Sequence, residues 1–235
     1  GKVSFYHHGR DGFHRSITTG KDMGERDVTS LRTYLKHDKG GDFDATLIYE
    51  YLRSRNGAPI VIHGTLAGEA EYMAPGTIWP GAALPMNQGP CTPGNMCRAT
   101  KESYFSDNSH QTDISNMDAH STTLTMNWDT SIGEITSITG YKRFSLSENT
   151  DQDGTPALFS DTHRITRGWQ FTQELRDAIQ VSDRLDVIAG VFFITDAYDH
   201  VQNYRVEFAV PGYLQRTAHQ QDNWQASVFL QGYYQ

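Results

Sequence analysis

A short run that begins at Asn149 has the residue types and spacing to bind a metal. Asn149, Asp151 and Asp153 place oxygen atoms at alternate positions, and Gly154 stands at the sixth position of a calcium loop. The twelfth position, where such loops have a bidentate Glu, is Ser160. The sequence therefore favours a turn rich in Asp and Gly and no metal site, with a calcium site on these three residues as the alternative.

Cys91 and Cys97 are the only cysteines, and they lie in a stretch rich in Pro and Gly. An exported chain passes through an oxidising compartment, which favours a disulfide that closes this small ring. Metal binding by two thiolates is the alternative, although further Cys or His ligands at a suitable spacing are not evident. We expect a disulfide that stiffens a surface loop.

Catalytic motifs are missing from the sequence. It contains no G-x-G-x-x-G, no G-x-x-x-x-G-K-[ST] and no G-x-S-x-G pattern. Polar residues at alternate positions, such as Glu174 and Arg176, are interpreted as the lining of a water-filled lumen in preference to a general acid and base. We therefore expect no enzyme activity and no cofactor. The net charge of -8, without a basic stripe, argues against a nucleic acid partner.

Segments of alternating polarity must position these side chains. Tight turns are expected at 38–42, 129–133 and 181–184, and long connections at 9–27, 54–118, 145–168 and 196–222. Between them lie segments of about ten residues, the length of a tilted strand that crosses a bilayer. The sequence predicts about eight strands: 3–8, 31–35, 43–51, 122–128, 135–144, 169–179, 185–193 and 224–234. Tight turns at one end and long connections at the other are typical of an antiparallel transmembrane β-barrel.

Alternate residues of these strands divide into a wet face and an apolar face. Polar residues are expected to line the lumen, namely Arg32, Lys36, Asp44, Thr46, Glu50, Lys142, Glu174 and Arg176. Aromatic residues near the strand ends are expected to form a girdle at the membrane interface, namely Tyr49, Tyr51, Trp128, Tyr141, Trp169 and Trp224.

Several segments, in their order and spacing, resemble the barrel of TonB-dependent outer-membrane receptors. The resemblance rests on residues 9–13, 18–24, 42–47, 137–142, 171–176 and 184–193. It implies an all-β, plugged barrel of about 22 strands in the bacterial outer membrane. It also implies uptake of a scarce nutrient with energy from TonB. A ferric siderophore is the commonest cargo, and haem, cobalamin and oligosaccharides are others.

The resemblance further implies that residues 1–235 are part of one barrel domain. We expect a fragment without the plug or the remaining strands, because the chain opens at Gly1 directly before a strand and stops at Gln235 inside one. The expected partners are membrane lipid, a small-molecule nutrient and, through regions outside this chain, the TonB complex. The longest connection contains Tyr72, Met73 and Trp79, which are expected to stack on or cap a ligand, the alternative being that the loop packs on itself.

Two rival interpretations stay open. A complete small outer-membrane barrel could be a structural protein, an adhesin or an enzyme, but its interior would be filled by side chains, whereas long charged residues are expected here. A soluble β-sandwich that binds a ligand would bury the apolar face, and its strands would be shorter.

Overall fold

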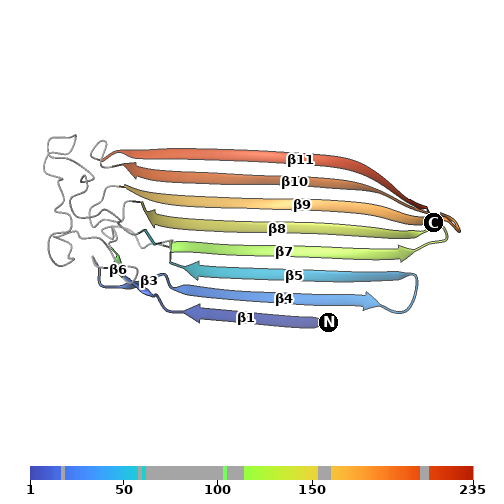
Figure 1. Cartoon of the computed structure of the whole chain (residues 1–235), viewed down its shortest axis with the longest axis horizontal. Helices are drawn as coiled ribbons and strands as arrows, with labels where there is room; N and C mark the ends of the chain where they lie inside the picture. The colour runs from blue at the N-terminus through green and yellow to red at the C-terminus, as the bar shows by residue number, and fades with distance from the viewer. Residues whose placement is uncertain are drawn as a thin grey trace.

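Eight long antiparallel strands form one sheet in the computed structural model, which describes residues 1–16, 19–57, 60–61, 103–104, 114–152, 160–206 and 212–234. The sheet order is β1-β4-β5-β7-β8-β9-β10-β11 (Figure 1). The all-β prediction with eight strands is confirmed. The strands are β1 (Lys2–Arg10), β4 (Arg26–Asp38), β5 (Phe43–Asn56), β7 (Ile114–Asp129), β8 (Glu134–Asp151), β9 (Ser160–Ser182), β10 (Leu185–Val206) and β11 (Leu214–Tyr234).

A small second sheet has the order β3-β2-β6 and lies at the end of the large sheet where the long connections are (Figure 1). It consists of β2 (His14–Ser16), β3 (Asp22–Met23) and β6 (Ser103–Tyr104). Strand β6 pairs in parallel with β2. The connection between β1 and β4 is therefore hydrogen-bonded to part of the long connection between β5 and β7.

The tight turns lie together at the opposite end of the sheet, as predicted (Figure 1). Strands β4 and β5 are joined by residues 39–42, where Gly40 has a φ of 71°. Glycine adopts this left-handed conformation without the clash that a Cβ atom introduces. The sequence signal for this turn thus has a direct backbone cause.

The predicted strand lengths and connection bounds are wrong. Strand β9 has 23 residues and β10 has 22, so both extend well beyond about ten residues. The connections shorten to 57–113, 152–159 and 207–213, and the connection from β1 to β4 runs over 11–25. In the added lengths most residues on both faces are polar, with exceptions such as Met117, Leu146 and Ile165, so the alternation in the sequence is weak. Cross-strand hydrogen bonds continue there, for example from Arg164 Nε to Gln202 Oε1 at 3.1 Å.

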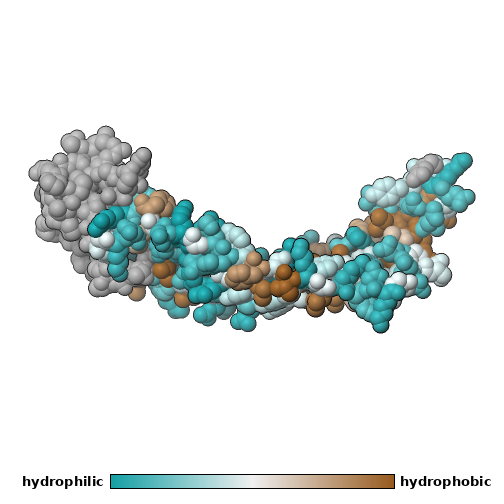
Figure 2. Space-filling model, turned by 90° about the horizontal axis from the view of Figure 1, so that it is seen from below, coloured by the Kyte–Doolittle hydropathy of each residue, from teal (hydrophilic) through white to brown (hydrophobic). Residues whose placement is uncertain are grey.

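The large sheet is a single layer that no other described element covers (Figure 1). Among the described residues, Met23 is the one buried hydrophobic side chain, and it lies in the small sheet. Large apolar side chains are instead exposed, including Phe5 at 70% and Val228 at 81%. Figure 2 shows a bowed sheet on which hydrophobic residues, from this side, gather in patches, one of them near the middle of its length. No helix formed by the described residues is long and apolar enough to cross a membrane.

The adjacent glycines of the first turn provide a test of this backbone geometry. A Cβ atom at Gly40 or at Gly41 would meet no heavy atom within 4 Å, and of the two only Gly40 has a positive φ. We expect Gly40→Ala to lower the free energy of unfolding by about 1–2 kcal/mol. Gly41→Ala, the matched control, should have an effect near zero. Urea unfolding in detergent micelles measures both, and equal losses for the two variants would contradict the turn described here.

Candidate functional site

All eight residues predicted to face water lie on one face of the sheet. Side chains that are directly paired across strands point to the same side, and the register therefore fixes the face of every residue. We call this the polar face, defined by Arg32, Glu50 and Lys142; the opposite, apolar face is defined by Leu47, Leu124 and Trp169. The other predicted residues on the polar face are Lys36, Asp44, Thr46, Glu174 and Arg176.

A row of polar side chains crosses the polar face from β1 to β11. Direct register pairs connect Ser4, Arg32, Glu50, Ser121, Lys142, Gln170, Asp196 and Asn223. Arg32 Nε lies 3.4 Å from Glu50 Oε1, and Ser121 Oγ donates to Glu50 Oε2 at 3.3 Å. Lys142 is exposed and makes no ion pair or hydrogen bond with the described residues. Its charge is available to a ligand.

Other predicted residues of this face pair near the tight turns. Asn127 Nδ2 donates to both carboxylate oxygens of Asp44, at 3.2 and 3.1 Å. Lys36 Nζ lies 2.7 Å from Asp38 Oδ2, and Arg176 lies 3.5 Å from Glu174. These groups satisfy one another. The row that contains Lys142 is therefore the better candidate for ligand contact.

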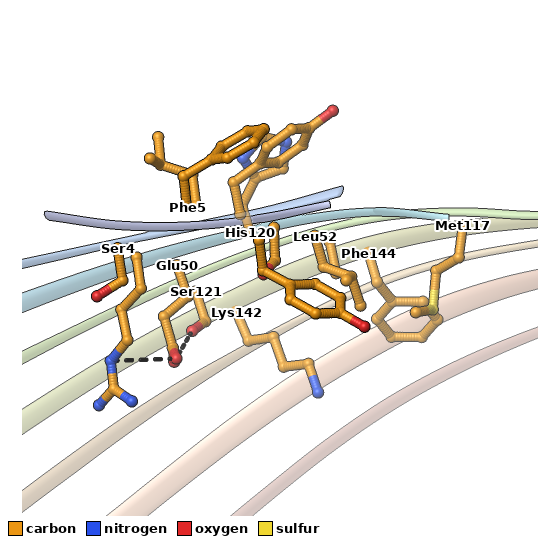
Figure 3. A pocket seen from close by; sticks show the side chains of 15 residues that line it. Ser4, Phe5, Glu50, Leu52, Met117, His120, Ser121, Lys142 and Phe144 are labelled. Atoms are coloured by element: carbon orange, nitrogen blue, oxygen red, sulfur yellow. Dashed lines mark hydrogen bonds and ion pairs between the residues drawn. The ribbon is translucent and has the colours of Figure 1, made fainter. Parts of the chain in front are cut away.

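A hollow of about 730 Å³ lies over this row (Figure 3). Its wall combines Arg32, Glu50 and Lys142 with apolar side chains on the side toward the long connections. The apolar members on the polar face are Tyr6, Leu52, Met117, Ala119 and Phe144. A ligand that has both rings and negative charge would find complementary groups there.

Phe144 is held in this hollow by a glycine on the next strand. Gly168 is the register partner of Phe144, and a Cβ atom at Gly168 would lie 2.8 Å from Phe144 Cε1. The carbonyl oxygen of Ala197 would lie 3.2 Å from this added Cβ atom. The aromatic ring therefore lies close to bare backbone, as is common where glycine interrupts a strand.

The sequence interpretation missed the apolar members of the hollow. Met117 fell in a segment predicted as a connection, and Phe144 was assigned to a strand without a role. The alternation along the strands could have found them, because these apolar side chains occupy positions that point to the polar face. An apolar residue on the polar face is a candidate for contact with a ligand.

The apolar face is a band bounded by aromatic rows. One row contains Phe5, Tyr51 and Trp169, and the row at the other edge contains Phe43 and Trp128. The nine residues from Phe43 to Tyr51 make eight steps and span about 26 Å along the strand. All six aromatic residues predicted for a girdle lie on this face, namely Tyr49, Tyr51, Trp128, Tyr141, Trp169 and Trp224.

The predicted calcium ligands do not form a loop in the described part. Asn149 and Asp151 lie in β8, paired with His163 and Asp161 of β9. An extended ladder replaces the turn that a calcium loop begins with. Other predicted residues lie outside the described residues, namely Asp153, Tyr72, Met73, Trp79, Cys91 and Cys97.

The large sheet is similar in fold to part of a known receptor. One solved structure with this likeness is the ferric yersiniabactin uptake receptor FyuA from Yersinia pestis, with a TM-score of 0.53 and 13% sequence identity. The match covers 99% of this chain and 39% of the receptor chain. No protein-family model and no curated protein matches the chain. The likeness establishes the fold alone, a sheet like part of the wall of a β-barrel receptor.

The close approach of Phe144 to Gly168 gives a test of the hollow. We expect Gly168→Ala to lower the free energy of unfolding by about 1–3 kcal/mol, because the added methyl group overlaps the ring. In a Phe144→Ala background the same change should have a smaller effect, since the overlapping ring is gone. Urea unfolding of the four proteins in detergent micelles measures the coupling. Purely additive effects would show that the ring does not lie over Gly168.

Proposed function

We propose that this chain forms part of the wall of an outer-membrane receptor of the TonB-dependent type, which imports a scarce nutrient. The observation that carries the proposal is the sheet itself: one face is a broad apolar band, the other carries a charged row, and no described element covers either. Such a sheet is stable where lipid contacts the first face and water the second.

A soluble sandwich fits this geometry poorly. A sandwich buries the inner faces of two sheets against each other, about 10 Å apart. The described residues provide one large sheet and a three-stranded one, whose β2 and β3 total five residues. Leu47, Leu124 and the other residues of the apolar face have no second layer to pack against. The sheet needs an apolar solvent.

A closed barrel made of these eight strands alone is also disfavoured. Strands β1 and β11 each pair with one neighbour among the described strands, and they do not pair with each other. Unpaired edges in a membrane leave backbone groups unsatisfied. Residues 1–235 are therefore proposed as a partial barrel domain in a wall of about 22 strands.

The proposed cargo is a ferric siderophore. The structural neighbour is a receptor for ferric yersiniabactin, and the hollow over Arg32, Lys142 and Phe144 offers both cationic and aromatic contacts. Haem, cobalamin and oligosaccharides are the alternative cargoes. The protein binds and moves its ligand and catalyses no reaction on it, and TonB acts through regions outside this chain.

Insertion in lipid is tested by two adjacent residues of the central strand β7. Leu124 lies in the middle of the apolar band, and Thr125 lies on the polar face. We expect Leu124→Arg to lower the free energy of unfolding in bilayers by about 2–4 kcal/mol, because the charge enters the hydrocarbon. Thr125→Arg should have little effect, since it faces water.

Reversible urea unfolding in phospholipid vesicles measures this difference. Similar losses for the two arginine variants would contradict the assignment of the faces. A wild-type protein that folds equally well without detergent or lipid would contradict a membrane location altogether.

Transport is tested in cells that lack other siderophore receptors and express the intact protein. We expect uptake of a radiolabelled ferric siderophore that stops when TonB is removed. Lys142→Gln should weaken binding of the same siderophore by about tenfold, because a charge-assisted contact is lost. Lys39→Gln, the same change in a tight turn, is the control. Uptake of none of a panel of siderophores would remove this cargo from the proposal, and uptake without TonB would remove the mechanism.

A further inference from the structure

Two histidines lie side by side on the polar face of the sheet. His200 of β10 and His219 of β11 are direct register partners, so their side chains point to the same side. Their ring centroids are 6.2 Å apart, and the two ring planes meet at an angle of 28°. Imidazole nitrogens are common ligands of transition metals, so a pair at this spacing is a candidate chelating site.

A threonine on the neighbouring strand orients the first ring. Thr166 of β9 is the other register partner of His200, and its Oγ1 lies 2.8 Å from His200 Nδ1. A neutral His200 that donates from Nδ1 to this hydroxyl keeps a lone pair on Nε2. Nε2 then points away from Thr166, and β11 with His219 lies on that other side of β10. Histidines that bind metals commonly have such a partner on the second ring nitrogen.

The spacing of the two rings suits one shared ion. Metal–nitrogen distances of about 2.0–2.1 Å place the centroids of two imidazoles roughly 5 Å apart around a tetrahedral ion. The observed 6.2 Å is only about 1 Å longer than this distance. His219 is exposed and makes no hydrogen bond or ion pair with the described residues. A small rotation of its side chain therefore closes the difference.

The charges around the pair leave room for a cation. On this face the register places Arg164 diagonally to His200, and Arg164 Nε already donates to Gln202 Oε1 at 3.1 Å. The register partner of Arg164 on β8 is Glu148, whose carboxylate balances its charge. The surroundings of the two rings are therefore close to neutral.

The pair supplies two ligands and leaves the other coordination positions open. Among the described residues, no group of three or more His, Cys, Asp or Glu side chains could hold a metal ion. Water or a donor atom of a small ligand would complete the coordination of an ion bound by the two imidazoles.

We propose that His200 and His219 bind a divalent late transition metal, of the class of Ni²⁺, Cu²⁺ and Zn²⁺, through their Nε2 atoms. Imidazole suits these ions, whereas Mg²⁺ and Ca²⁺ prefer oxygen ligands. The inference does not rest on the proposed function, because its parts lie on three adjacent strands. The pair lies two rows from Lys142 toward the long connections, so the ion would stand beside the hollow of the polar face.

Isothermal titration of Ni²⁺ alone into the intact protein in dodecyl maltoside micelles tests this site. The variants are His200→Gln, His219→Gln and the double variant. We expect either single change to weaken Ni²⁺ binding at least about tenfold, because losing a ligand costs no less than losing its hydrogen-bond partner. His8→Gln is the matched control on β1, in the same row of the same face, and should bind Ni²⁺ like the wild type.

The role of Thr166 is tested by Thr166→Val, which keeps the shape of the side chain and removes the hydroxyl. We expect Ni²⁺ binding to weaken by up to about tenfold, since the ring of His200 is no longer held. Electron paramagnetic resonance with one equivalent of Cu²⁺ counts the ligands directly. Two imidazole nitrogens should couple to copper in the wild type and one in either single histidine variant, a readout that a merely structural role would not change.

Three results would overturn the proposal. They are equal Ni²⁺ affinity of the wild type and the double variant, an equal loss caused by His8→Gln, and a single coupled nitrogen in the wild type. Urea unfolding without added metal separates metal binding from folding. Because His219 is exposed, His219→Gln should leave the free energy of unfolding unchanged, and its loss of Ni²⁺ affinity then reports on the site.

Discussion

The structure depends on one constraint: a long antiparallel ladder, with one register shift at Leu185 and Asp186, in a sheet that no other described element covers. Side chains alternate strictly along each strand, and register pairs carry the alternation across eight strands. The face of every residue is therefore fixed by its position in the ladder. No second layer of described residues buries the apolar face, and this is the feature on which the proposed contact with lipid depends.

Polar pairs on the sheet specify its register more than they stabilise it. The Arg32 and Glu50 side chains are 57% and 49% exposed, and exposed ion pairs contribute about 0–1 kcal/mol. A shift of one residue between β4 and β5 would move Arg32 out of register with Glu50 and exchange the two faces. The charged row and the apolar band therefore exclude the same wrong registers. The shape of the hollow around Lys142 depends in turn on the correct register of each strand that lines it.

Sequence alone predicts the strands, turns and faces wherever one face contacts apolar surroundings. It predicts a turn at Gly40, and it predicts that Leu31 and Arg32 point to opposite faces of the sheet. Both predictions succeed because turn residues and a period of two are local features of the sequence. It fails in the strand extensions toward the long connections, because residues such as Arg164 and Gln202 lie where both faces of the sheet are mostly polar. It also misses Met117 and Phe144 as members of one hollow, since their placement side by side depends on the pairing of β7 with β8.

Because side chains alternate along β8, two hollows lie back to back on the opposite faces of the sheet. Lys142 and Phe144 face the hollow of the polar face, while Tyr141 and Arg143 face the hollow of the opposite surface. The proposed ligand site therefore lies beside the aromatic row that contains Tyr51 and Trp169, next to strand extensions whose faces are mostly polar. A ligand bound at this level would be within reach of the long connections above it.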